Sequence, residues 1–158
     1  PGERALEPPP PAQRVDYRDE DGEEEADDGE DVDNAARLAL SHRARFVAGR
    51  WGDSLAGEFD VVVSNPPYVR ALDISTLSPE VSRFEPRFAL DGGLDGLARF
   101  REIASDIARV LAPDGIAVVE FGCGQSASVA GIMGDAGLRI GALVRDLSDR
   151  PRCAVLTR

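Results

Sequence analysis

The residues best suited to chemistry are Asn65, Pro66, Pro67 and Tyr68. Proline fixes its own backbone φ angle and has no N–H, so this segment offers many hydrogen-bond acceptors and few donors. The side-chain oxygen of Asn65 and the carbonyl of Pro66 can each accept a hydrogen bond from an amide or aromatic amine, and Tyr68 offers a flat face to pack against it. We therefore interpret the segment as a site that holds both hydrogens of a planar NH2 group.

Such a site suits methyl transfer to nitrogen. An amide nitrogen is a poor nucleophile because its lone pair is delocalised, so the useful contribution is to aim that lone pair at the methyl group of a sulfonium. Positioning of this kind contributes about 7–11 kcal/mol at best. No general base is needed if the proton leaves after the transfer, in agreement with the absence of a nearby histidine. The alternative is a proline-rich turn after a core strand, without a catalytic role.

The residues before and after this segment predict the strands that position it. Phe59–Ser64 is a β-branched run without a polar face, typical of a strand covered on both sides in a parallel sheet. Ile116–Phe121 predicts a second buried strand, and 44–48 predicts another that ends at Gly49. Asn65 would then lie at the carboxyl end of a strand, where open α/β sheets bind their ligands.

Helices and a hairpin complete the predicted fold. Asn34 can cap a short helix over 35–41, apolar residues at three- and four-residue steps predict a helix from Gly96 to Ala112, and another helix is expected over 126–135. The segments 138–144 and 152–157 predict a terminal antiparallel hairpin. This order indicates the α/β class, with an open doubly wound sheet.

The charge of the chain is concentrated near its beginning. The 158 residues are 42% hydrophobic and include 29 acidic and 18 basic side chains, for a net charge of -11. Residues 16–33 contribute all of that charge, with twelve acids and one arginine. Together with the proline run before them, they predict a disordered leader over 1–33 and a folded domain over 34–158. The nearly neutral domain has no basic footprint for nucleic acid.

Other function classes are disfavoured by the remaining composition. Cys123, Cys153 and His42 cannot form a four-ligand zinc site without carboxylates, so no metal is predicted. The apolar runs are far shorter than the roughly 20 residues of a membrane helix. The first residues lack the pattern of a signal peptide, so we expect a cytoplasmic protein.

Four stretches resemble one enzyme family in their order and spacing. They are FDVVVSNPPYV, RFEPRFALDGGLDGL, LAPDGIAVVEFGCGQ and RDLSDRPRCAVLTR. The chain resembles, over roughly residues 34–158, the HemK/PrmC-type peptide chain release factor glutamine methyltransferases. The resemblance implies a Rossmann-like class I methyltransferase fold, S-adenosylmethionine as methyl donor, and the glutamine of the Gly-Gly-Gln loop of class I release factors as acceptor.

The resemblance also implies roles for individual residues. Asn65, Pro66, Pro67 and Tyr68 match the catalytic positions that bind the substrate glutamine, and Asn65 also matches a cofactor contact. Trp51 matches a position beside the cofactor adenine. A tryptophan that covers the rim of the sheet is an equal alternative for Trp51. The neighbouring Arg50 stands where the family often has aspartate.

A glycine-containing turn leaves a second enzymatic interpretation open. Residues 122–127 fit the pattern G-x-G-x-x-A after a strand, so they could hold a cofactor phosphate or methionine group. Read literally, this order suits a permuted DNA adenine methyltransferase, with Asp146 as a candidate for binding the ribose. Within the resemblance, however, the same residues form a turn where helix and strand approach closely, and we favour that interpretation.

The first strands of the family have no counterpart in this sequence. The family has a glycine-rich cofactor loop and two strands before the point corresponding to Asn34, where this chain has prolines and acids. A third hypothesis is therefore a truncated, catalytically inactive copy that acts, if at all, by association through an exposed sheet edge. Near the acceptor motif, Glu85 and Arg87 could guide a substrate peptide, although a surface ion pair is the favoured interpretation.

Overall fold

The computed structural model describes residues 28–47 and 49–158, which belong to two compact units divided between Leu55 and Ala56. The first unit contains helix α1 (Asp28–Arg37). This helix begins inside the acidic stretch, so the expected helix start at 35 was placed too late. Asn34 is not a cap but lies within the helix, where its Oδ1 accepts a hydrogen bond from Arg37 at 2.6 Å. The rest of the predicted disordered leader lies outside the described residues.

The strand predicted over 44–48 is absent from the described part of the first unit. Residues 44–47 have no regular secondary structure, and Ala48 lies outside the described residues. A strand needs a partner for its backbone hydrogen bonds, and the described residues of this unit contain no other strand. Local β-branched and aromatic composition was therefore not sufficient to make a strand here.

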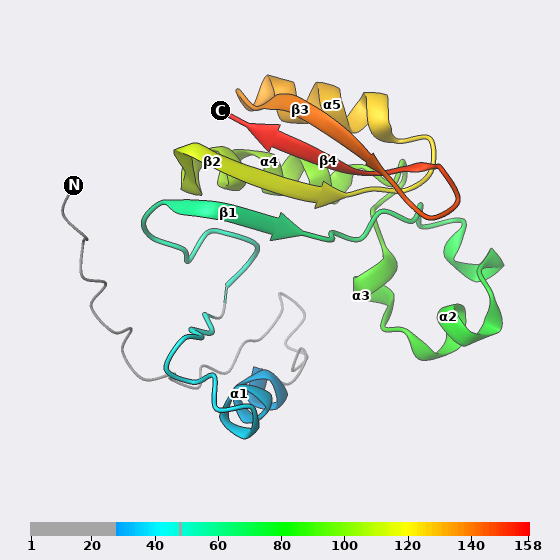
Figure 1. The fold of residues 1–158 in the computed structure, drawn as a ribbon. Coiled ribbons are helices and arrows are strands. Elements are labelled where there is room, and N and C mark those ends of the chain that lie inside the picture. The colour runs from blue at the N-terminus through cyan, green and yellow to red at the C-terminus, as the bar shows by residue number, and fades with distance from the viewer. Residues whose placement is uncertain (1–27, 48) are drawn as a thin grey trace. The chain divides into compact units, whose positions relative to one another are not determined.

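The second unit is built on a mixed four-stranded sheet (Figure 1). Its strands are β1 (Phe59–Ser64), β2 (Leu111–Glu120), β3 (Arg139–Arg145) and β4 (Pro151–Thr157), in the spatial order β1-β2-β4-β3. β1 and β2 are parallel, whereas β4 runs antiparallel to both β2 and β3. The predicted terminal hairpin is confirmed, and it joins the sheet through its second strand.

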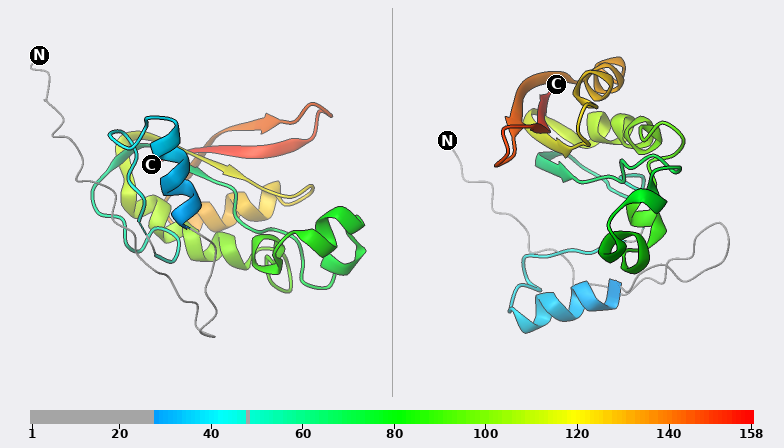
Figure 2. Two further views of the ribbon diagram at one scale, coloured as in Figure 1. Left: turned by 90° about the horizontal axis from the view of Figure 1, so that it is seen from below. Right: turned by 90° about the vertical axis from the view of Figure 1, so that its right-hand side faces the viewer.

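Two long helices pack on the same face of this sheet (Figure 2). Helix α4 (Ala98–Val110) connects β1 to β2, and α5 (Ser126–Asp135) follows β2 and has the predicted bounds. Three short helices, η1 (Ile74–Thr76), α2 (Pro79–Phe84) and α3 (Arg87–Leu90), lie between β1 and α4. None of the described helices is long and apolar enough to cross a membrane.

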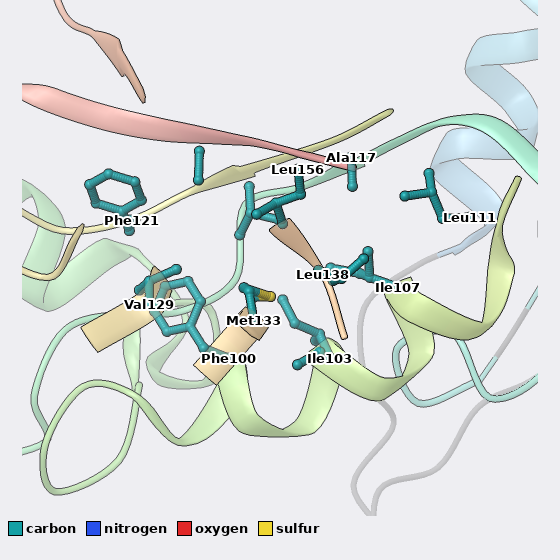
Figure 3. Close-up of a cluster of buried hydrophobic side chains, with 13 residues drawn as sticks. Phe100, Ile103, Ile107, Leu111, Ala117, Phe121, Val129, Met133, Leu138 and Leu156 are labelled. Atoms are coloured by element: carbon teal, nitrogen blue, oxygen red, sulfur yellow. The ribbon is translucent and has the colours of Figure 1, made fainter. Parts of the chain in front are cut away.

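The core lies between the two long helices and the sheet (Figure 3). Phe100 from α4, Met133 from α5 and Leu156 from β4 are fully buried there, together with Phe121 just after β2. Burying a side chain of this size contributes roughly 1.5–3 kcal/mol to stability. This packing fixes the end of β2 relative to α5.

The opposite face of the sheet is open in the described residues. Val61 and Val63 of β1 are 57% and 74% exposed, whereas Val62 packs against the core. The prediction that β1 is covered on both faces is therefore wrong for the part of the chain that the structure describes, because α4 and α5 both pack on the other face. The α/β class and the open sheet are confirmed.

Candidate active site

The Asn65–Tyr68 segment, here called the acceptor loop, lies directly after β1 at the carboxyl end of the strand, as predicted. Asn65 is exposed, and no described residue donates to or accepts from its side chain, so its amide is available to a ligand. Pro66, by contrast, is fully buried. The loop therefore presents its first residue to solvent and anchors its second residue in the protein.

Tyr68 is held by the last residue of the neighbouring strand. Its hydroxyl donates to Oε1 of Glu120 at 3.0 Å, and its half-buried ring packs against the core. Burial and, next, the hydrogen bond to the Glu120 carboxylate raise the pKa of Tyr68 above its ordinary value. The phenol is thus neutral and committed to Glu120 at physiological pH, so Tyr68 serves to place its ring and the adjoining backbone rather than to exchange protons.

The backbone after the acceptor loop pairs with the segment around Asp91. The Val69 N–H donates to the carbonyl of Leu90 at 3.0 Å, and the Gly92 N–H donates back to the carbonyl of Val69 at 2.8 Å. The Ala71 N–H then bonds to the carbonyl of Gly93 at 2.9 Å. The structure therefore brings two of the four stretches that carry the family resemblance into direct contact.

Two glycines make this close approach feasible. A Cβ on Gly92 would lie 2.9 Å from both the carbonyl oxygen of Pro67 and the Cα of Tyr68. Gly96 has a φ of +74°, and a Cβ there would lie 2.7 Å from the carbonyl oxygen of Tyr68. The sequence placed Gly96 at the start of the predicted helix and did not reveal the close approach of either glycine to the acceptor loop.

The turn after β2 supports the same loop from another side. The Gln125 side-chain nitrogen donates to the carbonyls of Tyr68 and Gly96, at 3.1 Å each, and its oxygen accepts from the Gly122 N–H at 2.8 Å. A Cβ on Gly122 would lie 3.1 Å from Cδ2 of the Tyr68 ring. This glycine pattern is therefore occupied by internal contacts, which supports its interpretation as a structural turn.

Sequence reasoning missed Gln125 and Glu120 because one glutamine in a turn and one glutamate ending an apolar strand form no recognisable pattern. Their position after β2, next to β1 in a parallel sheet, is the one signal that could have pointed to them. Parallel neighbours bring their carboxyl ends to the same edge, so residues after β2 must lie near residues after β1.

Several other candidates have structural roles. Asp146 accepts hydrogen bonds from the N–H groups of Ser148 and Arg150 at 2.8 and 3.0 Å, and Arg152 lies 3.3 Å away. These contacts, led by the Arg150 N–H, lower the pKa of Asp146 and commit it to the β3–β4 turn rather than to a ribose. Arg87 pairs with Asp91 at 3.3 Å, so the expected Glu85–Arg87 ion pair is wrong.

Trp51 belongs to the first unit, whereas the acceptor loop belongs to the second. Its backbone has a φ of +55°, in the left-handed region that is uncommon for a residue other than glycine, and its side chain is 37% exposed. Of the two cysteines, Cys153 is half-buried in β4, whereas Cys123 is exposed.

The sequence is similar to curated bacterial enzymes, although no protein-family model matches it. It is 47% identical over 125 residues to the release factor glutamine methyltransferase of Rhodospirillum rubrum and 49% identical over 121 residues to that of Caulobacter vibrioides. These matches cover 79% and 76% of this chain. They cover 38% and 42% of the relatives, so the chain spans about two fifths of the proteins it matches.

Among solved structures, the chain is similar to a TehB-like SAM-dependent methyltransferase from Corynebacterium glutamicum. The TM-score is 0.47 at 20% sequence identity, over 80% of this chain and 62% of that one.

Proposed function

Because this chain resembles the release factor glutamine methyltransferases over most of its length, we propose that it carries the acceptor site of such an enzyme. The reaction would be S-adenosylmethionine-dependent transfer of a methyl group to the side-chain amide nitrogen of the glutamine in the Gly-Gly-Gln loop of class I release factors. The observation that supports it best is the exposed Asn65 amide, which has no partner among the described residues and lies at the carboxyl end of β1, on a loop held from several sides.

The acceptor loop would bind the substrate amide through oxygens. The Asn65 side-chain oxygen and the Pro66 carbonyl would each accept one hydrogen of the NH2 group, and neither Pro66 nor Pro67 contributes an N–H that would compete. Asn65 is exposed, so the amide would enter from its side, and the carbonyl of the fully buried Pro66 would have to become accessible when the substrate binds. With both hydrogens held, the plane of the amide is fixed and the nitrogen lone pair points out of that plane.

In this reaction the acceptor loop would position the substrate amide rather than remove its proton. Glu120 contacts the loop through Tyr68, whose hydroxyl donates to its Oε1. The substrate proton would leave to solvent after the methyl group has been transferred. Alignment of reacting groups supplies up to about 7–11 kcal/mol, and this alignment is the contribution that the loop would make to methyl transfer.

The described residues by themselves do not form a cradle for S-adenosylmethionine. The glycine pattern after β2 is already filled, since its Gly122 N–H bonds to Gln125 and its backbone faces the Tyr68 ring. Asn65 and Trp51 remain proposed cofactor contacts, and this role is supported only by the family resemblance.

A methylation assay tests this function. The chain is incubated with S-adenosylmethionine and a class I release factor, and the Gly-Gly-Gln peptide is examined by mass spectrometry for one added methyl group. We expect Asn65→Ala to reduce transfer at least about a hundredfold, because misalignment of reacting atoms has effects of this size. Asn34→Ala, which changes the same residue type in α1, serves as the matched control and should retain full transfer.

Two outcomes would contradict the proposal. Equal transfer by the wild type and Asn65→Ala would remove the role of the acceptor loop. Absence of transfer by the wild type, with no calorimetric signal for S-adenosylmethionine, would instead favour the inactive-fragment hypothesis. If the cofactor does bind, weaker binding by Trp51→Ala would support the assigned adenine contact.

A further inference from the structure

The side chain of Gln125 joins three backbone segments that are distant in sequence. Its nitrogen donates to the carbonyls of Tyr68 and Gly96, and its oxygen accepts from the Gly122 N–H. All three contacts are between 2.8 and 3.1 Å, within the normal range of hydrogen bonds. Both ends of the side-chain amide are thus in use, in a residue that is itself only partly exposed.

One consequence is that the peptide unit leaving the acceptor loop is held at both ends. Its carbonyl, that of Tyr68, accepts from Gln125, and its N–H, that of Val69, donates to the carbonyl of Leu90 at 3.0 Å. Because a peptide unit is planar, fixing its C=O and N–H fixes its orientation. The Tyr68 phenol is fixed separately by Glu120, so backbone and side chain of this residue are anchored by different partners.

The proline rings restrict the rest of the loop. The φ angles of Pro66 and Pro67 are set by their rings, and the fully buried Pro66 cannot shift without moving its surroundings. Few free torsions separate the held Tyr68–Val69 peptide from the Asn65 side chain. An anchor at Tyr68 therefore limits the positions that Asn65 can adopt.

We propose that Gln125 is a positioning residue for the acceptor loop, acting through the Tyr68 carbonyl to keep Asn65 in place. The inference rests on the proposed function only in its final step, that the position of Asn65 matters for methyl transfer. Gln125 does not need to touch substrate or cofactor. Its donor half holds the acceptor loop, and its acceptor half holds the turn after β2.

Two substitutions separate these halves. Gln125→Leu has a similar size and removes both the donor and the acceptor. Gln125→Glu retains an oxygen for the Gly122 N–H but, as a carboxylate at neutral pH, cannot donate to Tyr68 or Gly96. Cys123→Ala changes an exposed side chain of the same turn that makes none of these contacts, and it is the control.

Backbone amide exchange measured by NMR reports, without any ligand, how firmly Gln125 holds the neighbouring backbone. Gln125→Leu should reduce protection of both the Val69 and Gly122 amides about tenfold, the effect of losing roughly one net hydrogen bond. Gln125→Glu should reduce protection at Val69 but not at Gly122. Cys123→Ala should leave both unchanged, and the Val119 amide, in β2 between β1 and β4, reports on global unfolding.

The result that overturns the inference is unchanged Val69 protection in Gln125→Leu. An equal loss at Val69 and Val119 would also overturn it, because it would show a general loss of stability. The functional step is tested by kinetics on a release factor, where Gln125→Leu should lower kcat about tenfold or more and leave KM for S-adenosylmethionine unchanged. An unchanged kcat would contradict that step. If the wild type transfers no methyl group, the proposed function fails while amide exchange still decides the role of Gln125.

Discussion

Asn65 and Tyr68 belong to the same short loop but have opposite environments. Asn65 is exposed and its side chain has no partner among the described residues, whereas Tyr68 is half-buried with its hydroxyl bonded to Glu120. A residue that binds a ligand must keep its polar atoms free, and a residue that supports it must have them satisfied. Asn65 therefore presents its polar atoms to a ligand, and Tyr68 anchors the loop.

The raised pKa of Tyr68 leads to a prediction about alkaline pH. A group whose pKa is higher in the folded state than in the unfolded state binds its proton more tightly when folded, so stability falls as pH rises through its titration. The contribution of Tyr68 should be fully present below its ordinary pKa of about 10 and lost above it. The midpoint for Tyr68, obtained from the difference in ultraviolet absorbance between the wild type and Tyr68→Phe, should lie above that value.

A stability measurement tests whether the hydrogen bond between Tyr68 and Glu120 causes this pH dependence. Tyr68→Phe removes the hydroxyl and leaves the Glu120 carboxylate without this donor, which should cost about 1–2 kcal/mol of unfolding free energy in urea at neutral pH. The difference between the two proteins should shrink as the pH approaches the titration of Tyr68. A constant difference across the alkaline range would show that the hydrogen bond is not responsible.

At the scale of elements, the site depends on how closely three backbone segments approach one another. Gly92 and Gly96 let the segment before α4 lie against the acceptor loop, and Gly122 lets the turn between β2 and α5 lie against the Tyr68 ring. The core between α4, α5 and the sheet fixes the elements that carry these glycines. Missing Cβ atoms, rather than additional side chains, make the assembly fit.

Two alanine substitutions test whether the close approach of these segments requires glycine. At Gly122 a Cβ would meet the Gln125 oxygen at 2.8 Å and the Tyr68 ring at 3.1 Å, so Gly122→Ala should cost about 1–3 kcal/mol of unfolding free energy. Gly131 is exposed within α5, and a Cβ there would meet nothing within 4 Å. Gly131→Ala should therefore add about 0.5–1 kcal/mol through helix propensity. Thermal unfolding compares them, and equal effects would contradict the packing argument.

At the scale of the whole molecule, the second unit presents an apolar sheet face. Val61 and Val63 of β1 are more than half exposed, and in the register of the sheet they lie beside Ile116 and Val118 of β2. In the described residues β1 also pairs along one edge alone, leaving backbone donors and acceptors on the other. Faces and edges of this kind favour association.

We therefore expect the purified chain to associate with a second copy as its concentration rises. Val63→Lys should weaken that association about tenfold, because it replaces an apolar side chain whose burial contributes roughly 1.5 kcal/mol. Leu147→Lys makes the same type of change in the fully exposed β3–β4 turn and should have no effect. Sedimentation velocity over a concentration series measures both, and a wild type that stays monomeric throughout would refute the expectation.

The sequence by itself determined the elements whose signals are local. The β-branched run of β1, the helical spacing of α4, the bounds of α5 and the terminal hairpin could be predicted because each depends on residues close together in the chain. The acceptor loop could also be located, since two prolines after a strand restrict the backbone in any context. The strand expected over 44–48 failed because a strand depends on a partner that composition does not supply.

Only the tertiary structure decided what surrounds the acceptor loop. Glu120 and Gln125 lie 52 and 57 residues from Tyr68 along the chain, and they meet it because parallel strands bring their carboxyl ends to one edge. Likewise, the structure placed both long helices on one face and left Val61 and Val63 of β1 exposed on the other. Contacts between distant segments depend on the complete packing of the sheet, which periodicity along the chain does not encode.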